Sequence, residues 1–352
     1  MLAKPGRIPA NTDGTWLLEP KWDGFRAIVF KMGDELYLQS RDEKPLGRYF
    51  PELLASLHAN LPARCVLDGE IVIATGDRLD FDALLQRIHP AESRVKLLAE
   101  RSPSAFVAWD LLALDDEDLR PLPQHERRAR LERALADVKP PIYVTPMTRD
   151  PAVAQDWFER FEGAGLDGVI AKPGDLPYTP GKRVMTKIKH VRTADCVVGG
   201  FRWYKGGKGT LVGSLLLGLY DDDGKLQHVG VTSAFTQEFR AELAQLLAPL
   251  AEHAREGHPW GEWAAWQDSQ APADGAQRKP GAKSRWTQHK DLSWVPVKLG
   301  LVCEVSFDHL QGSRFRHAAH WKRWRPDKPV ADCGYEQIAE IPAFELGAIF
   351  RR

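Results

Sequence analysis

Short segments of strand length, separated by turns that contain glycine and aspartate, are the feature that most limits what this chain can fold into. In the first third, they are rich in apolar and β-branched side chains, and Gly33-Asp34 has the composition of a hairpin turn. Four segments share this pattern: residues 25–31, 35–40, 65–74 and 105–114. Residues 16–118 are therefore predicted to be mainly β-structure.

Helical and strand patterns alternate after this region. Two segments favour helix and two favour strand: residues 123–138 and 152–161, then residues 168–172 and 186–190. The first helical segment is charged and amphipathic, and the second follows Asp150-Pro151, a helix cap with a proline behind it. This mixture predicts an α+β domain of antiparallel sheets and helices over residues 1–192.

The residue pattern of the sequence changes near Thr193, where segments with strand patterns begin to dominate again. Five strand segments and one helix are expected: residues 196–203, 214–220, 227–233, 299–307 and 314–316, with the helix at 235–250. Several strands and one helix in about 150 residues predict a small β-barrel. Residues 267–284 contain few bulky apolar side chains and are predicted to be a loop inside it. The second domain is therefore placed at residues 193–352.

Composition excludes some classes of protein and leaves others open. Lysine and arginine together number 48, as do aspartate and glutamate, so nucleic-acid binding would need local basic patches. The cysteines are scattered without the spacing of a zinc site: Cys65, Cys196, Cys303 and Cys333. No signal peptide and no run of about 18 apolar residues is present. We expect a cytoplasmic protein that does not contact membranes.

The sharpest local feature is Lys21-Trp22-Asp23-Gly24-Phe25-Arg26. A lysine beside a glycine-containing turn, with an arginine five residues on, suits attack on a phosphate. A lysine amine is nucleophilic only when neutral, and at its reference pKa about one in 2,500 is neutral at pH 7. Taken alone, the motif is also compatible with a surface lysine in a turn.

Further motifs follow in order and change this balance. They are Ser40-Arg41, Leu67-Asp68-Gly69-Glu70, the segment FVAWDLL at 106–112, the segment LDGVIAK at 166–172, Lys187-Ile188-Lys189 and Arg325-Pro326-Asp327-Lys328. The series resembles the covalent nucleotidyltransferase superfamily of ATP-dependent DNA ligases and mRNA-capping enzymes. It is most similar to small bacterial ATP-dependent DNA ligases, the type called ligase C or the ligase domain of ligase D. The resemblance covers about residues 10–330, and implies an adenylation domain followed by an OB-fold barrel.

The resemblance implies roles for the cationic residues. Lys21 would attack the α-phosphate of ATP and form a lysine–AMP intermediate. Lys187 and Lys189 lie two apart on an expected strand, so both face one side and would contact the α-phosphate, unless they form a solvated strand face. Arg26 and Arg41 would contact the ribose, the phosphates or the 5′-phosphate of nicked DNA.

The resemblance also implies how adenine and a metal ion are bound. Phe106 would stack on the adenine ring, although its apolar neighbours also suit a core residue. At Glu19, the carboxylate or a nearby backbone carbonyl would accept a hydrogen bond from the adenine edge. Glu70 and Asp167 would hold Mg²⁺ or Mn²⁺ on the triphosphate. The family usually has glutamate where Asp167 stands, and the shorter side chain would place a water between carboxylate and metal.

The barrel carries its own candidates. Arg325 and Lys328 would orient pyrophosphate during self-adenylation. A neighbouring segment mixes basic and aromatic residues, as DNA-binding surfaces do. The predicted DNA contacts are the cations of this segment: Arg314, Arg316, Lys322 and Arg323. The alternative is that the segment is an exposed charged loop.

Together, these motifs indicate an ATP-dependent DNA ligase, an enzyme that forms phosphodiester bonds. It would seal nicks in duplex DNA during repair, through adenylated Lys21 and then an adenylated 5′-phosphate. The barrel would swing about a hinge near Thr193 between steps. We expect a monomer that relies on other DNA repair proteins. The alternatives are an RNA ligase, an mRNA-capping type of nucleotidyltransferase, or a non-catalytic OB protein that binds nucleic acid.

Overall fold

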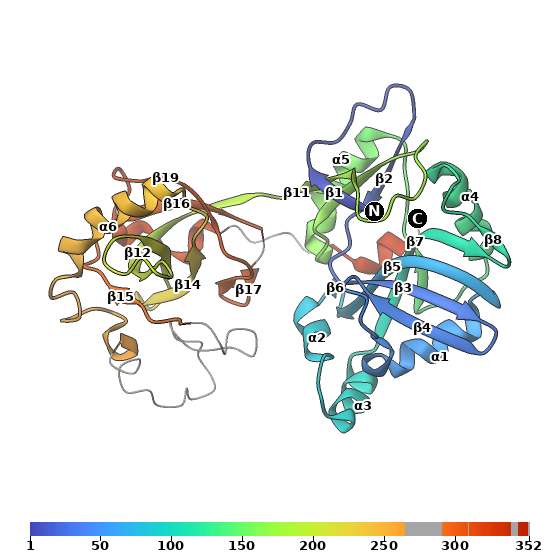
Figure 1. Ribbon diagram of the computed structural model, residues 1–352, viewed down its shortest axis with the longest axis horizontal. Coiled ribbons are helices and arrows are strands. Elements are labelled where there is room, and N and C mark those ends of the chain that lie inside the picture. Colours follow the sequence, from blue (N-terminus) through green and yellow to red (C-terminus); the bar gives the residue numbers. More distant parts are fainter. Residues whose placement is uncertain (265–290, 309, 339–343, 351–352) are drawn as a thin grey trace. The chain divides into compact units, whose positions relative to one another are not determined.

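The computed structural model describes residues 1–264, 291–308, 310–338 and 344–350 (Figure 1). The chain forms two compact units. The first is Met1–His190 with Ile341–Arg352, and the second is Val191–Glu340. The loop predicted at residues 267–284 lies outside the described residues.

The larger sheet of the first unit confirms the β-rich prediction for this part of the chain. Its strands run in the order β4-β3-β5-β7-β8, with β6 paired to β5 and β9 paired to β7. Their bounds are β3 Phe25–Met32, β4 Glu35–Ser40, β5 Arg64–Thr75, β6 Arg78–Leu79, β7 Ser104–Leu114, β8 Glu117–Asp118 and β9 Ile142–Val144. The predicted hairpin at Gly33-Asp34 joins β3 and β4, which pair antiparallel from Ala27 to Met32.

Helices pack against the sheets of the first unit at several points. Their bounds are α1 Pro51–Asn60, α2 Phe81–Gln86, α3 Glu92–Arg101, α4 Gln124–Ala134 and α5 Pro151–Arg160, with short 3-10 turns at Gly47–Tyr49 and Phe161–Ala164. Only α4 and α5 were expected, and Asp150 caps α5 by accepting from the Ala152 amide. Helix α1 lies against the large sheet (Figure 1), and its Leu53 and Leu57 are buried in the core beneath it. The prediction of mainly strand over residues 16–118 therefore missed three helices.

The smaller sheet has the order β1-β11-β10-β2. Its bounds are β1 Leu2–Pro5, β2 Trp16–Pro20, β10 Gly168–Pro173 and β11 Arg183–Lys189. One face carries Val169, Ala171 and Ile188, which pack with Trp157 of α5. Side chains alternate along a strand, so the opposite face presents the polar residues of these strands. Glu19, Lys172, Lys187 and Lys189, which are described below, come from that polar face.

The C-terminal helix α8 (Leu346–Phe350) packs in the first unit, where it is drawn in red in Figure 1. Leu346 and Ile349 are buried in the same cluster as Trp157 and Phe161. The Phe344 ring lies 5.2 Å from the Phe161 ring. The predicted second domain ran to the end of the chain, so the structure differs here, because these apolar side chains find their core in the first unit.

The second unit is a sheet that closes on itself. Its order is β14-β13-β12-β16-β19, with β15 paired to β12 and a separate β17-β18 pair. The bounds are β12 Arg192–Trp203, β13 Val212–Tyr220, β14 Leu226–Thr232, β15 Val295–Pro296, β16 Val302–Phe307, β17 Leu310–Gln311, β18 Arg314–Phe315 and β19 His320–Trp324, with helix α6 Gln237–Ala251 and 3-10 turns Val330–Asp332 and Tyr335–Gln337. A bridge from Thr232 to Ala319 links β14 with the start of β19. Because the two ends of the sheet meet, the unit is a barrel, as predicted.

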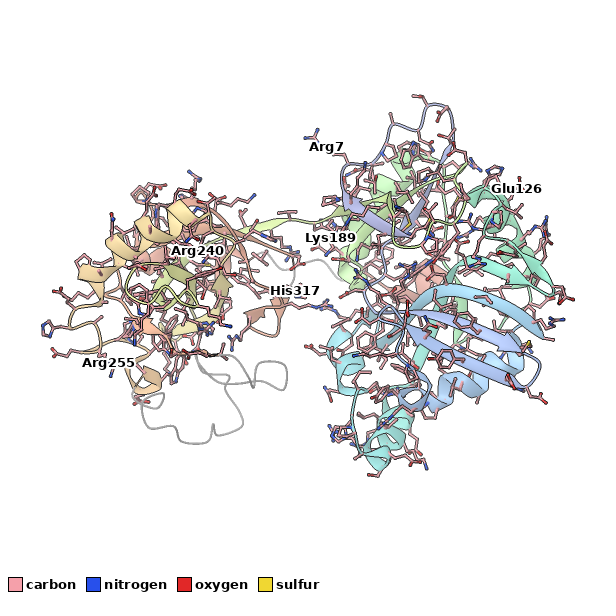
Figure 2. All side chains as sticks on the ribbon, in the orientation of Figure 1. Arg7, Glu126, Lys189, Arg240, Arg255 and His317 are labelled. Carbon is pink, nitrogen blue, oxygen red and sulfur yellow. The ribbon has the colours of Figure 1, made fainter. Side chains whose placement is uncertain are left out.

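The barrel is held together by a core of aromatic and aliphatic side chains around Trp260. Arg240 of α6 donates to the carbonyls of Val212, Gly213 and Ser233, which ties the helix to the strands (Figure 2). Among the described residues, no helix is long and apolar enough to span a membrane.

Candidate nucleotide site

Lys21 follows β2 and is fixed by its backbone. Its amide donates to the Gly168 carbonyl at 2.8 Å, and its carbonyl accepts from the Asp167 amide at 2.9 Å. Gly168 has φ +127°, and a Cβ there would collide with the Ile188 carbonyl, so only glycine suits this position. The Asp-Gly of LDGVIAK therefore brings Asp167 beside Lys21, and the Lys21 Nζ forms an ion pair with the Asp167 carboxylate.

Two lysines share the Asp167 carboxylate. Its Oδ2 also lies 2.9 Å from the Nζ of Lys189, the last residue of β11 (Figure 2). The Asp167 side chain is 4% exposed, whereas those of Lys21 and Lys189 are 21% and 26% exposed. Both ammonium groups thus remain open to a solvent-borne anion while their counter-charge is buried beneath them.

Lys187 extends the same cationic face. Burial is the main reason that its pKa is lowered, followed by the positive charges of Lys189 and Lys21. In register, Lys187 lies opposite Ile170, which in turn lies opposite Glu19. The structure therefore brings together the three lysines that sequence analysis grouped on the α-phosphate.

Glu70 projects from β5, opposite Arg26 on β3. Burial raises the pKa of Glu70 to about 8, although the charges of Lys21 and Arg26 oppose this. A Cβ at Gly24 would collide with the Ile71 carbonyl and with the Glu70 side chain, so the glycine lets the Lys21 loop run close to β5. This close approach explains why the motif needs glycine at that position.

Glu70 and Asp167, the predicted metal ligands, are surrounded differently. Among the described residues, no group of three or more His, Cys, Asp or Glu is placed to hold a metal ion. Asp167 is paired with lysines, and Glu70 has a raised pKa. Mg²⁺ keeps waters and phosphate oxygens and needs only one or two carboxylates. The residues therefore fit a metal that arrives with a nucleotide, and do not form a site of their own.

Arg26 forms an ion pair and hydrogen bonds with neighbours in the first unit. It donates from two nitrogens to Asp68 at 2.9 and 2.6 Å, and also to the Met1 carbonyl and the Tyr178 hydroxyl. Burial opposes the ionisation of Asp68, but the Arg26 charge and hydrogen bonds outweigh burial and lower the pKa of Asp68. Arg41 differs, because it lies in the exposed turn after β4. The predicted phosphate and DNA contacts of both arginines stay predictions.

The structure buries Phe106, the residue predicted to stack on adenine, and leaves another aromatic residue of the same strand half-buried. Phe106 is fully buried on the face of β7 that packs with α1, beneath Gly69. Trp109 is half-buried instead, and its ring lies 5.8 Å from the Lys172 Nζ and 5.9 Å from the Arg26 guanidinium. A register shift puts Gly69 opposite Ala108 and Asp68 opposite Asp110, so Trp109 is an extra residue in this strand. Sequence periodicity gives no warning of such a shift.

Glu19 is nearly buried and has two cationic neighbours, for which the sequence predicted no role. Its Oε2 lies 2.7 Å from the Lys172 Nζ, and its Oε1 lies 3.4 Å from the Arg128 Nη1. Lys172 ends the LDGVIAK motif, which was a usable signal. Arg128 lies inside α4, 109 residues from Glu19, and no local pattern indicates the contact.

The barrel candidates lie in the second unit, where two of the arginines are paired with carboxylates. Arg325 donates to Asp195 at 2.8 and 2.9 Å, and to Asp327 at 2.8 Å. Arg323 donates to Glu304 at 2.6 Å. The other predicted contacts vary in exposure: Lys322 is exposed, whereas Arg314, Arg316 and Lys328 are half-buried. Trp321 and Trp324 pack against the barrel core, so they do not stand out as platforms for bases.

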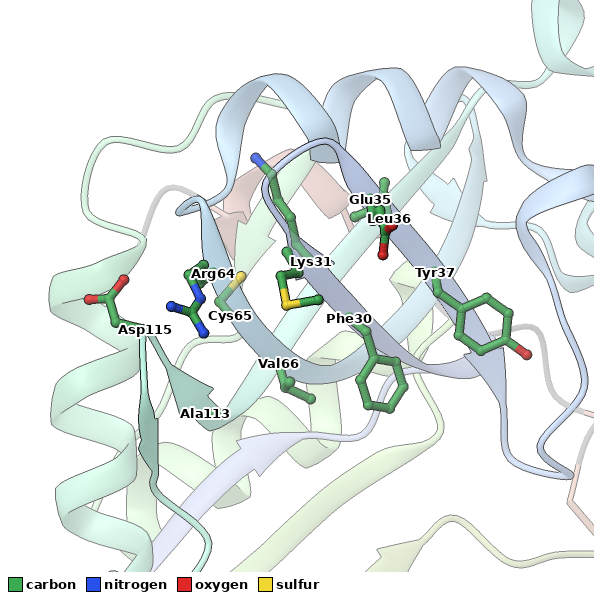
Figure 3. A pocket seen from close by; sticks show the side chains of 11 residues that line it. Phe30, Lys31, Glu35, Leu36, Tyr37, Arg64, Cys65, Val66, Ala113 and Asp115 are labelled. Carbon is green, nitrogen blue, oxygen red and sulfur yellow. The ribbon is translucent and has the colours of Figure 1, made fainter.

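The hollow in Figure 3 lies elsewhere on the large sheet. It has a volume of about 460 Å³, and its lining includes Phe30, Met32, Tyr37 and Arg64 at the ends of β3, β4 and β5. None of its lining residues was predicted to act on a nucleotide. The candidate nucleotide site is therefore the polar face around Lys21, and not this hollow.

Comparison with known proteins agrees with this geometry. A family model described as the ATP dependent DNA ligase domain matches residues 1–189, and one described as the ATP dependent DNA ligase C terminal region matches residues 208–328. DNA ligase C2 of Mycolicibacterium smegmatis is 54% identical over 325 residues, covering 92% of this chain and 90% of the relative. DNA ligase C of Mycobacterium tuberculosis is 54% identical over 326 residues, covering 91% of this chain and 88% of the relative.

A solved structure from a study of Lig E DNA ligases has the same fold. Its TM-score is 0.53 at 17% identity, over 92% of this chain and 98% of that one. At this identity, the likeness supports the fold alone. The family models and the two relatives carry the identification, because together they span nearly the whole chain and agree on one activity. The chain belongs to the ATP-dependent DNA ligases.

Proposed function

We propose that Lys21 is the nucleophile of this ligase and that AMP is carried on its Nζ. The observation that supports the proposal best is the shared carboxylate, because Asp167 holds both Lys21 and Lys189 beside Lys187. Three lysines around one buried carboxylate leave a surplus of positive charge that faces solvent. A triphosphate is the ligand whose charge matches such a surplus.

In the first step, the Lys21 amine loses its proton and attacks the α-phosphorus of ATP. The new N–P bond forms as the bond from the α-phosphorus to the bridging oxygen breaks, and pyrophosphate leaves. Lys187 and Lys189 stabilise the negative charge on the α-phosphate oxygens in this transition state. Arg325 and Lys328 act on the pyrophosphate. Trp109 provides an aromatic face for the adenine ring, and Glu19 accepts from its edge.

Glu70 and Asp167 would hold Mg²⁺ or Mn²⁺ that arrives with the nucleotide. When bound, the ion neutralises phosphate charge and favours departure of the pyrophosphate. The raised pKa of Glu70 supports this role, because burial destabilises the ionised form of its carboxyl. A cation that binds beside the carboxylate would stabilise that ionised form.

The next two steps act on nicked duplex DNA. The 5′-phosphate attacks the lysine–AMP and takes the AMP, which restores the Lys21 amine. The 3′-hydroxyl then attacks the adenylated 5′-phosphate, the phosphodiester bond forms, and AMP leaves. We propose that the cations at Arg314, Arg316, Lys322 and Arg323 contact the DNA backbone, that Arg26 and Arg41 approach the 5′-phosphate, and that the protein works as a monomer in repair with other repair proteins.

Incubation with α-labelled ATP tests the nucleophile. The wild-type protein should retain the label covalently, whereas Lys21→Ala should retain none and should not seal a nick. Lys182→Ala is the matched control, because Lys182 is an exposed lysine just before β11. Label on the Lys21→Ala protein would locate the nucleophile at another residue. Labelling from GTP instead of ATP would favour a capping type of enzyme.

A further inference from the structure

Glu19 is a carboxylate almost removed from water. Only 2% of the residue is exposed. Lys172 of β10 lies 2.7 Å from its Oε2, and Arg128 of α4 lies 3.4 Å from its Oε1. Both cations are themselves buried, at 3% and 4% exposed. Burial of a charge is tolerated only when partners compensate it, so these three residues form one unit.

The two cations leave acceptor capacity on Glu19. Two carboxylate oxygens offer about four acceptor positions in total. Lys172 uses one at short distance, and Arg128 approaches the other oxygen at the limit of a hydrogen bond. In the strand register, Glu19 lies opposite Ile170, whose other neighbour is Lys187. The remaining acceptors therefore belong to the same strand face as the phosphate-binding lysines.

Lys172 connects the carboxylate with the aromatic residue. Its Nζ lies 3.4 Å from the Trp109 carbonyl and 5.8 Å from the centre of the Trp109 ring. The Lys172 ammonium group thus contacts both the Glu19 carboxylate, on the smaller sheet, and the Trp109 ring, on the larger sheet. Binding of a purine needs these two features together, one for the face and one for the edge.

Arg128 is anchored so that its reach toward Glu19 is fixed. It donates to the Thr145 carbonyl at 2.7 Å and to Glu132 at 2.7 Å. The Thr145 hydroxyl accepts from the Trp22 indole at 2.8 Å, and Trp22 is the neighbour of Lys21. The helix α4 is therefore linked through Thr145 to the loop that carries the nucleophile.

We propose that Lys172 and Arg128 are positioning residues for purine selection: they hold Glu19 where it accepts from the 6-amino group of adenine. The proposal rests on the proposed function, in which Glu19 contacts the adenine edge. Guanine has an oxygen acceptor at that position, which a carboxylate repels. A buried acceptor left without its donor also costs affinity, so the site rejects purines that lack the amine.

The test compares ATP with two other nucleotides: purine riboside triphosphate, which differs only in having hydrogen in place of the 6-amino group, and GTP, which has an oxygen at position 6 and also an amine at position 2. Rates of covalent labelling give kcat/KM for each. The variants are Lys172→Met, Arg128→Gln and Arg128→Lys, with Arg130→Gln as the matched control. Arg130 lies on the same helix and pairs with Glu117, away from Glu19.

In the wild type, ATP should be preferred over purine riboside triphosphate. In Lys172→Met, this preference should fall by about 10- to 100-fold, the range for loss of one hydrogen bond to a charged group. The loss should appear in KM for ATP more than in kcat, because the base is remote from the reacting phosphorus. Arg128→Gln should lose less, Arg128→Lys should regain part of the preference, and Arg130→Gln should match the wild type.

A second variant guards against a folding defect, since Lys172→Met leaves a buried carboxylate without its nearest cation. Glu19→Gln has nearly the same shape and removes the charge that needs compensation. If Lys172 acts through Glu19, then Lys172→Met made in the Glu19→Gln background should not change the nucleotide preference further. Equal losses for ATP and purine riboside triphosphate, or additive effects in the double variant, would overturn the proposal. No label from ATP on the wild type would instead overturn the proposed function.

Discussion

The two units of this ligase compensate positive charge in opposite ways. In the first, one carboxylate serves two lysines, because Asp167 pairs with Lys21 and Lys189. In the second, two carboxylates serve one arginine, because Arg325 pairs with Asp195 and Asp327. The first arrangement presents unbalanced charge to an anion. In the second, an anion must compete with carboxylates already in place, so its cations should have smaller effects when removed.

The largest expected effect comes from removing the shared carboxylate. Asp167→Asn keeps the shape but leaves Lys21 and Lys189 without their counter-charge and without a fixed position. We expect self-adenylation to slow on the order of 100-fold or more, as when a positioned polar group is lost from an active site. Single-turnover labelling with ATP measures this. Asp175→Asn, an exposed aspartate after β10, is the control and should label normally.

The next effect concerns the doubly paired arginine. Arg325→Ala should slow self-adenylation by about 10- to 100-fold, the value of one charge-assisted contact. Sealing of a nick that is already adenylated should change little, because pyrophosphate has gone by then. Lys328→Ala should behave alike, and Lys225→Ala, in an exposed turn of the same unit, should affect neither step. Equal losses in both assays would mean that Arg325 supports the barrel or its DNA binding.

The contrast between the units also marks what the sequence could predict. The strands around Gly33-Asp34 and the order of the motifs could be predicted from the sequence, because strand periodicity and turn chemistry depend on neighbouring residues alone. The Lys187 and Lys189 pair was readable for the same reason. The contact from Arg128 to Glu19 was not, since it joins residues 109 apart through tertiary packing alone.

Two features that the sequence did not predict have equally physical causes. Phe106 and Trp109 lie three residues apart on β7, so strand alternation puts their rings on opposite faces. Tertiary packing then decides that Phe106 is buried against α1 and that Trp109 stays half-buried, which no single segment encodes. Helix α1 lacks a side chain that caps its first turn and lies in a region dominated by strand patterns, so its existence is decided by Leu53 and Leu57 packing onto the sheet.

A third effect tests the raised pKa of Glu70, which is about 8 against an ordinary value of 4.5. A raised pKa means that the neutral carboxyl stabilises the fold below pH 4.5, and that this contribution is lost as pH rises toward 8. Glu70→Gln should therefore have a higher Tm than the wild type at pH 9 and a similar Tm at pH 4. Each kcal/mol corresponds to roughly 2–4 °C.

Metal-free protein and thermal unfolding followed by circular dichroism give the measurement. Glu35→Gln is the control, because Glu35 is exposed on the same sheet. A Tm difference that does not depend on pH would show that the substitution acts through packing and not through ionisation. The variant should also label poorly from ATP at every pH, since an amide is a weaker ligand for Mg²⁺ than a carboxylate.

The smallest effect separates DNA contact from local pairing in the barrel. Arg314 lies 2.6 Å from the ring of His228, whose pKa is lowered well below its usual value by burial and by the nearby arginines. The predicted contact with DNA therefore competes with interactions inside the unit. If Arg314 and Arg316 neutralise phosphates, affinity for a nicked duplex falls with salt at a log–log slope of about −0.9 per contact. Removing both should flatten that slope by up to about 2 units.

Fluorescence titrations of a labelled nicked duplex at several salt concentrations decide this last point. The double variant Arg314→Ala with Arg316→Ala should bind with the flatter slope and still label normally from ATP, because self-adenylation does not require DNA. Lys225→Ala should leave the slope unchanged. An unchanged slope in the double variant would assign both arginines to structure within the barrel. The DNA contacts would then rest on Lys322, which is exposed, and on Arg323, whose pair with Glu304 would have to open.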